Sequence, residues 1–268
     1  MTAVEPKKKK SVRLWAVVFW LLVWQGASMA LPVLYPHGAL LLASPLSALA
    51  RLGELAVTAA FWRTALTSAA RILGGFLLAC ALAVVLAALA AQYRRVEELL
   101  APLVSVVKAV PVASFIILAL VWLGTSPLPA FISFLMVYPL IFTNVRAGIQ
   151  SVDPEILRMA KVFHLPPLTK VRRIYAPSAF GHFVTSVKAS LGLAWKAGIA
   201  AEVLAAPKYS IGRMLYQSKV YFETTDLFAW TLVIIILSLL IELAVGKLFD
   251  RAARRSRRMK GAKTENEA

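Results

Sequence analysis

The chain has 268 residues, of which 60% are hydrophobic and only 16% are charged. Soluble domains average about 45–50% apolar and about 25% charged residues, so this composition excludes an ordinary soluble enzyme and indicates several membrane spans. The net charge is +17, but the cations gather beside apolar runs, which favours a membrane surface over nucleic acid as the partner. A lone Cys80 leaves no disulfide pair and no cysteine metal site.

Six segments are predicted to cross the membrane as helices, since a span needs about 20 mostly apolar residues. The third of them is short, and it reaches full length only if its helix starts near Ala101 and includes Lys108. The fifth is the least apolar because it carries Lys196 and Glu202. The six segments are residues 14–34, 72–91, 109–123, 128–145, 189–206 and 227–245. The sequence therefore predicts an all-α, polytopic membrane protein.

Lysines and arginines in the connections predict the orientation. The basic clusters lie on one side of a six-span chain, whereas the connection at 124–127 on the other side carries no charge. Arg51, Arg63 and Arg71 argue mildly against this arrangement. We expect both termini in the cytoplasm, with a basic N-terminal tail (1–13), a membrane domain (14–250) and a basic C-terminal tail (251–268).

Two connections on the outer side are predicted to contain helices. The apolar residues of 35–71 recur with helical spacing, which indicates an interfacial helix that leads into the second span. Residues 207–226 are predicted to form a second amphipathic segment.

The segment 153–177, DPEILRMAKVFHLPPLTKVRRIYAP, is basic and interrupted by prolines between the fourth and fifth predicted spans. Asp153-Pro154-Glu155 is typical of a helix start, with a capping residue, a proline and an acid in the first turn. His164-Leu165-Pro166-Pro167 should end that helix, because a residue before proline avoids the helical region. A second short helix is expected from Pro167 until Ala176-Pro177 closes it.

Both short helices are predicted to carry an apolar face. The pattern leaves two interpretations open: a knob that fits a groove on a partner protein, or a helical hairpin on the membrane surface that organises its neighbours. The apolar positions are Ile156, Met159, Ala160 and Phe163 in the first helix and Leu168, Val171 and Tyr175 in the second.

This segment resembles the cytoplasmic-loop motif of permease subunits of binding-protein-dependent ABC importers. That motif runs Glu-Ala-Ala, three residues, Gly, and a spacer that ends in Leu-Pro. Here Arg158-Met159-Ala160 occupies the first three positions, His164 the glycine position and Ala176-Pro177 the Leu-Pro position. The preceding Asp-Pro-Glu and the spacing match the motif.

Further segments are similar to the nitrate/sulfonate/taurine branch of these permeases: SPLSALARLGEL, SAARILGGF, SLGLAWKAGIAAEVL and the basic C-terminal tail. The resemblance covers residues 14–255. It implies the type I importer permease fold in the inner or plasma membrane, as a homodimer whose copies dock on an ABC ATPase dimer and receive substrate from an extracytoplasmic solute-binding protein. It assigns the ATPase contact to residues of the cytoplasmic segment: Met159, Ala160, Phe163, His164, Leu165, Pro166 and Leu168.

Two charged residues inside the fifth predicted span are candidates for the translocation pathway, since such a residue costs about 2.5–3.5 kcal/mol at the membrane centre. Lys196 and Glu202 are six positions apart, about 240° round a helix, so they do not form a pair on one face. Lys196 either lines the pathway and favours an anion, or makes a structural ion pair or hydrogen bond. Glu202 either belongs to the pathway or braces its outer end.

The sequence contains no GxxxxGK[ST] phosphate loop, so we expect no ATP hydrolysis by this chain, and no metal or cofactor. The expected function is the permease subunit of an ABC importer that works by alternating access. Its substrate would be a small anion or organic solute such as nitrate, a sulfonate or taurine, with a pyrimidine precursor as an alternative. A polytopic membrane enzyme and a structural or regulatory membrane protein are the competing classes.

Overall fold

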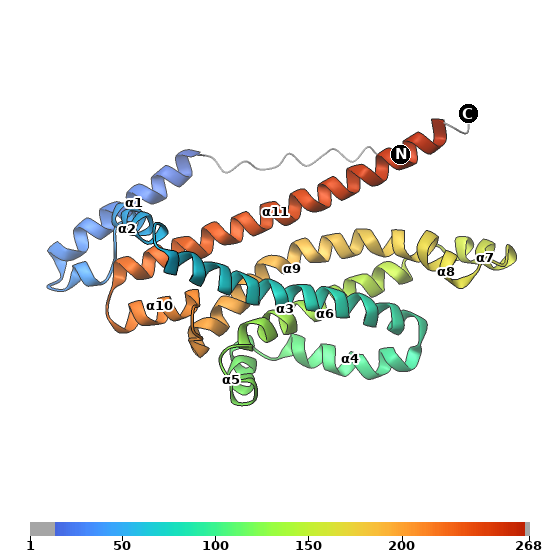
Figure 1. Cartoon of the computed structure of the whole chain (residues 1–268), viewed down its shortest axis with the longest axis horizontal. Coiled ribbons are helices and arrows are strands. Elements are labelled where there is room, and N and C mark those ends of the chain that lie inside the picture. The colour runs from blue at the N-terminus through green and yellow to red at the C-terminus, as the bar shows by residue number, and fades with distance from the viewer. Residues whose placement is uncertain (1–13, 266–268) are drawn as a thin grey trace.

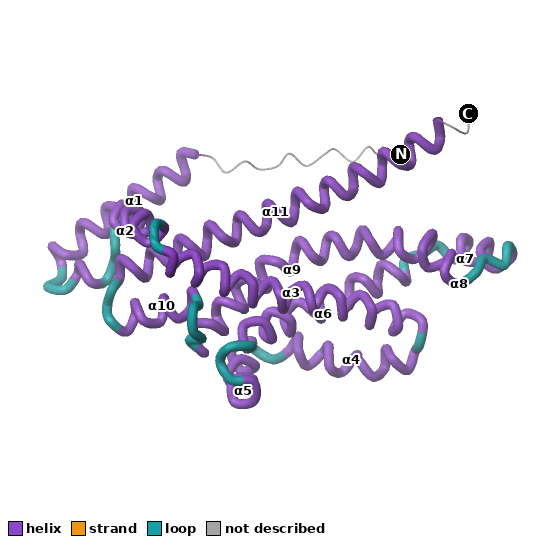
Figure 2. Tube along the Cα trace, in the orientation of Figure 1, coloured by secondary structure: helices purple, strands orange, loops and turns teal. Residues whose placement is uncertain are grey.

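The computed structural model describes residues 14–265, and within them every regular element is helical (Figures 1 and 2). The expected all-α class is therefore confirmed. In chain order the elements are α1 (Leu14–Leu34), the 3₁₀ turn η1 (Gly38–Leu40), α2 (Pro45–Ala56), α3 (Ala59–Gln92), α4 (Arg94–Ala109), α5 (Val112–Leu123), α6 (Leu128–Gln150), α7 (Pro154–Val162), α8 (Pro167–Lys170), the π-helical turn η2 (Val171–Tyr175), α9 (Ala176–Ala205), α10 (Ile211–Val220) and α11 (Thr224–Glu265).

The centre of the bundle is formed by α3, α6 and α9, which run side by side along its long axis (Figure 1). One strip of α3 consists of Ala79, Ala83, Ala87 and Ala90, each at most 2% exposed. A Cβ at Gly75 would lie 1.9 Å from the Ala130 carbonyl oxygen, so glycine alone allows α3 to approach α6 this closely. Small residues thus bring the helices together where lipid gives no hydrophobic driving force.

Four described helices are long and apolar enough to cross a membrane: α1, α3, α6 and the part of α11 up to Phe249. The bent pair α4 and α5 would make a fifth if it counted as one span. The fifth predicted span lies within α9, which does not meet the same criterion because it carries Lys188, Lys196 and Glu202. Even so, α9 packs along α6 and α3 in the middle of the bundle.

The prediction of a continuous third span from near Ala101 to Leu123 is wrong. The chain bends by 110° between α4 and α5, and Val110 has the extended backbone conformation with φ −82° and ψ 133°. Pro111 is the cause, since proline disfavours the helical region for the residue before it. As a result α4 lies beside the bundle, whereas α5 runs in a different direction from α4 and packs on α6 and α9 (Figure 1).

The helices expected in the two outer connections are present as α2 and α10, at the end of the bundle opposite α7 (Figure 1). The Ser44 hydroxyl caps α2 by accepting a hydrogen bond from the Ser47 N–H at 3.1 Å. Arg51 of α2 donates from Nε to Asp226 Oδ1 of α11 at 2.6 Å, which ties α2 to α11. Hydrogen bonds to Asp226 and Glu54 raise the pKa of Arg51.

Candidate functional site

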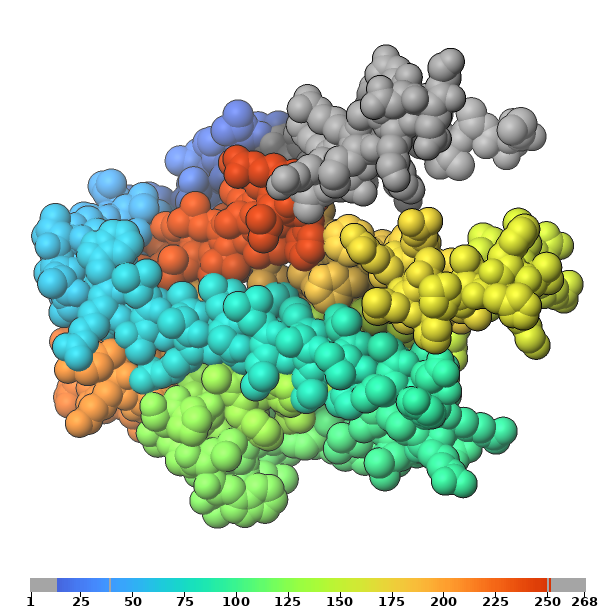
Figure 3. Space-filling model, turned by 45° about the vertical axis from the view of Figure 1, so that its right-hand side comes forward, coloured from blue at the N-terminus to red at the C-terminus, as the bar shows by residue number. Residues whose placement is uncertain are grey.

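Residues 153–177, called the elbow below, project beyond the ends of α3 and α6 (Figure 1) and stand out in the space-filling view (Figure 3). The first leg of the elbow is α7, and the second leg is α8 followed by η2. The elbow joins α6 to α9, the two helices that pack most extensively on each other.

The first leg begins and ends as its sequence predicts. Asp153 Oδ1 accepts a hydrogen bond from the Glu155 N–H at 2.8 Å, and Pro154 lies in the first turn. At its other end the His164 N–H donates to the Lys161 carbonyl at 3.1 Å, and the Leu165 N–H donates to the Ala160 carbonyl at 3.0 Å. This is a Schellman motif, whose left-handed position favours glycine. His164 has φ +48° there, so it adopts the conformation that the family's glycine would supply.

The apolar side chains of the elbow point away from the bundle. Met159, Phe163 and Leu168 are 59%, 72% and 79% exposed. Ala160 is instead 2% exposed, and Leu165 is half-buried. The seven residues assigned to ATPase contact thus divide into exposed side chains (Met159, Phe163, His164, Pro166 and Leu168) and inner ones (Ala160 and Leu165).

The prediction that Ala176-Pro177 ends the second leg is wrong. The helices α8, η2 and α9 form one uninterrupted helical run. The Ala176 N–H donates to the Val171 carbonyl, five residues back, in the wider spacing of a π turn. Pro177 therefore lies inside the continuous run, directly after the π turn.

A clasp of small residues fixes the base of the elbow to the bundle. Ser178 Oγ and Ser151 Oγ both donate to the Gly148 carbonyl, at 2.7 Å and 2.9 Å. A Cβ at Gly148 would lie 2.9 Å from Ala179 Cα, so glycine lets the end of α6 touch the start of α9. The base of the elbow is therefore held against the end of α6 and the start of α9.

A cavity of about 240 Å³ lies beside the second leg. It is lined by Val84 and Ala88 of α3, Val145 of α6, and Val171 and Tyr175 of η2, together with neighbouring residues of these helices. The second leg therefore borders open space on the side that faces α3.

Lys196 and Glu202, the two pathway candidates, are not brought together. Lys196 is exposed on α9, whereas Glu202 is 0% exposed. This difference agrees with their expected separation round the helix.

Glu202 joins three helices. Its Oε2 accepts a hydrogen bond from Ser68 Oγ of α3 at 2.8 Å and one from the Gly212 N–H of α10 at 3.2 Å. Ser68 Oγ in turn accepts from the Ile211 N–H at 2.9 Å. Two free N–H groups at the start of α10 are thereby capped, and Glu202 Oε1 is buried without a partner among the described residues.

Sequence reasoning missed Ser68 as the partner of Glu202. Thr64, Ser68 and Arg71 follow one another at helical spacing, but Arg63 and Thr67 in the same segment are polar too, so the sequence does not single out Ser68. Arg71 also reaches the segment between α9 and α10, donating from both terminal nitrogens to the Lys208 carbonyl at 3.1 Å. The polar stripe of α3 therefore holds the start of α10 in place.

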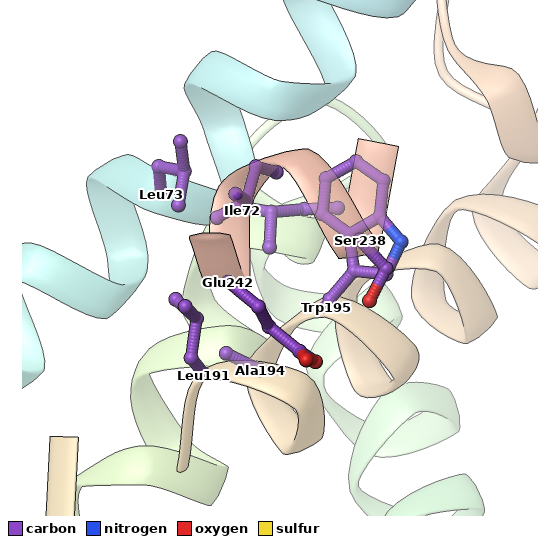
Figure 4. Close-up of a pocket in the computed structure, with 8 residues that line it drawn as sticks. Ile72, Leu73, Leu191, Ala194, Trp195, Ser238 and Glu242 are labelled. Atoms are coloured by element: carbon purple, nitrogen blue, oxygen red, sulfur yellow. The ribbon is translucent and has the colours of Figure 1, made fainter. Parts of the chain in front are cut away.

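A second carboxylate lies in the seam between α9 and α11, which is too narrow to hold a water molecule. Figure 4 shows Glu242 pointing from α11 toward Leu191 and Ala194 of α9. In the same seam Trp195 Nε1 donates to the Ile234 carbonyl at 3.1 Å. This seam packs two helices together and offers no open site.

No group of three His, Cys, Asp or Glu side chains within residues 14–265 is arranged to hold a metal ion.

Comparison with known proteins identifies the class. Residues 82–258 match the family model described as the binding-protein-dependent transport system inner membrane component. A probable ABC transporter permease of Brucella melitensis is 29% identical over 81% of this chain and 87% of its own length. The putative aliphatic sulfonates permease SsuC of Bacillus subtilis is 25% identical over 67% of this chain and 62% of its own. The bicarbonate permease CmpB of Synechocystis is 28% identical over 71% and 65%.

Solved structures with a similar fold are ABC transporters. An inward-facing form of the MetNI methionine ABC transporter matches 70% of this chain and 91% of the solved chain, with a TM-score of 0.53 and 18% identity. An amino acid ABC transporter with histidines matches 91% and 99%, with a TM-score of 0.52 and 13% identity. These matches show the fold, that of type I importer permeases, and the resemblance noted in the sequence is confirmed.

Proposed function

Because the chain belongs to the family of binding-protein-dependent transport system inner membrane components and is the permease subunit of an ABC importer, we propose that the elbow is where an ATPase subunit drives it. The chain is a transport component and not the catalytic one, in keeping with its permease relatives. The competing classes, a membrane enzyme and a regulatory protein, are not favoured.

One observation carries the proposal for the elbow. Three apolar side chains, Met159, Phe163 and Leu168, are more than half exposed on a projection that is clasped to α6 and α9. A projecting apolar surface of this kind suits a groove on a partner. The alternative is a helical hairpin that lies on the membrane surface. Such a hairpin would not need to be fixed firmly to α6 and α9.

Permeases of this family work with an ATPase and a solute-binding protein. For this chain we infer two copies on an ATPase dimer, with the elbow of each copy seated on one ATPase subunit. ATP binding would close the ATPase dimer, and the elbows would carry α6 and α9 with them. The bundle would then change between inward-facing and outward-facing states, each favoured by the ligand that binds it better.

We infer the orientation from this arrangement. The elbow lies on the cytoplasmic side together with both termini, so that α2 and α10 lie on the outer side. The membrane domain comprises 14–250, flanked by the basic tails 1–13 and 251–268. Residues 1–13 and 266–268 lie outside the described residues.

We infer a small anion as the substrate, because relatives are named for aliphatic sulfonates and bicarbonate. Lys196 is exposed on α9 in the single chain, so in a dimer it would be available to a pathway that carries anions. Glu202, being buried, would brace the outer end of the pathway. An organic solute such as taurine or a pyrimidine precursor would be the alternative cargo.

Co-purification tests the proposal. The chain is expressed with a candidate ABC ATPase subunit from the same genome, and the ATPase is expected to remain bound in detergent. Phe163→Asp should release the ATPase while the permease still inserts normally. Retention of the ATPase by the Phe163→Asp variant would contradict the role of the elbow.

A further inference from the structure

One face of α10, at the end of the bundle opposite the elbow, borders an open cavity of about 340 Å³. The buried side of this helix carries Ile211, Gly212 and Ser218. The cavity is lined by the opposite side together with Ala206, the left-handed residue that ends α9. The other lining residues are Arg213, Tyr216, Gln217 and Val220 of α10 and Tyr221 directly after it, which follow the i, i+3, i+4, i+7, i+8 spacing of one helix face.

The polar groups of this face can all donate hydrogen bonds. Arg213 brings five N–H donors in a planar fork, Tyr216 a hydroxyl and Gln217 an amide. Among the residues that the structure describes, the ion pairs involve Arg51, Arg94 and Arg146. Arg213 forms no ion pair with a described Asp or Glu side chain. A guanidinium of this kind matches the geometry of a small oxyanion.

The cavity wall is held in place before any ligand arrives. Ser68 Oγ and Glu202 Oε2 fix the first two N–H groups of α10, at 2.9 Å and 3.2 Å. A Cβ at Gly212 would lie 2.4 Å from Glu202 Cβ, so α10 rests directly on α9. A rigid support of this kind positions a binding site without a further ordering cost.

We propose that the Arg213 face of α10 is a subsite for a small, singly charged oxyanion, such as a bicarbonate or sulfonate group. One water molecule takes about 30 Å³ of liquid, so the cavity holds such an anion with part of its hydration shell. The proposal rests on the proposed function for its place on the outer side, where substrate would enter.

Cysteine labelling tests the subsite without transport. Val220→Cys, in a Cys80→Ala background, places a thiol on the cavity wall of the full chain in lipid nanodiscs. Its reaction is compared for the anionic sulfonatoethyl methanethiosulfonate and the cationic trimethylammonium-ethyl analogue. The anionic-to-cationic rate ratio should fall by about fourfold in Arg213→Gln, because the lost unit charge lies about 10 Å along the helix from residue 220 and acts with opposite sign on the two reagents in water. Methanesulfonate or bicarbonate should slow labelling, whereas chloride at equal ionic strength should not.

Val57→Cys is the matched control, because Val57 is an exposed residue near the same end but outside the cavity lining. Its rate ratio should not respond to Arg213→Gln. An unchanged ratio at residue 220, or equal protection by chloride, would overturn the subsite. The subsite would also be overturned if Arg213→Gln kept normal labelling and normal protection but lost stimulation by the solute-binding protein. Arg213 would then bind an acidic group of that protein.

Failure of the subsite is distinguishable from failure of the proposed function. Labelling requires neither the ATPase nor the solute-binding protein. Selective protection by oxyanions therefore supports the subsite even if the elbow variants leave uptake unchanged. Conversely, if the elbow variants abolish uptake, the proposed function is supported, and the subsite is still tested only by the effect of Arg213→Gln on labelling.

Discussion

The Ser68 hydroxyl of α3 donates a 2.8 Å hydrogen bond to Glu202 Oε2 of α9, at a point where both side chains are fully buried. The same carboxylate oxygen accepts from the Gly212 N–H, so one side chain fixes three helices relative to one another. Burial without these donors would be costly, because an unpaired buried carboxylate loses its hydration. We therefore regard Glu202 as a brace for α10.

Replacing Glu202 by alanine should destabilise the protein by about 2 kcal/mol, since two buried hydrogen bonds are lost and each contributes about 1 kcal/mol. Glu202→Gln keeps an oxygen for Ser68 and Gly212 and should retain most of that stability. Unfolding by sodium dodecyl sulfate in mixed micelles measures the difference. Glu223→Ala, which removes an exposed carboxylate between α10 and α11, is the control. Equal stability of Glu202→Ala and the unchanged protein would refute the brace.

Replacing His164 by glycine should stabilise the turn between the legs of the elbow by up to about 1 kcal/mol. His164 holds φ +48°, a conformation that costs other residues about 1–2 kcal/mol and glycine almost nothing. His164→Val should have the opposite effect, because a branched Cβ fits this region poorly. Hydrogen exchange of the α7 amides reports both changes. Faster exchange in His164→Gly would show that the turn is not strained.

If Lys196 supplies positive charge to the pathway, replacing it by methionine should reduce anion uptake at least tenfold. A tenfold reduction corresponds to a loss of about 1.4 kcal/mol of stabilisation of the anion. The side chain is exposed, so folding should be unaffected, and Lys196→Arg should retain uptake. Uptake into proteoliposomes that contain the whole transporter measures the effect. Full uptake by Lys196→Met at normal expression would assign Lys196 a structural role only.

The sequence predicts most of the elements because their signals are local. The capping Asp153, the end of α7 before Pro166-Pro167 and the apolar runs of α1, α3, α6 and α11 all follow from adjacent residues. The polar composition of α9 also predicts its difference from the other spans. These features need no knowledge of the neighbouring helices.

The errors occur where a local signal has two outcomes. Pro111 breaks the third predicted span, whereas Pro177 lies inside a continuing helix, directly after a π turn. The residues next to each proline do not distinguish the two outcomes. At Pro177 the helix continues as α9, which packs along α6. The Ser68–Glu202 contact likewise joins residues 134 positions apart, and only the three-dimensional arrangement reveals it.

The central claim is that the elbow receives force from an ATPase, and the ATPase activity of the whole transporter tests it most directly. The double variant Phe163→Asp, Leu168→Asp removes the two most exposed apolar side chains among the residues assigned to ATPase contact, and Val57→Asp, at the opposite end, is the control. We predict that stimulation of ATP hydrolysis by liganded binding protein, and uptake with it, disappear in the double variant and persist in the control. Stimulation and uptake at normal levels in the double variant would contradict the account.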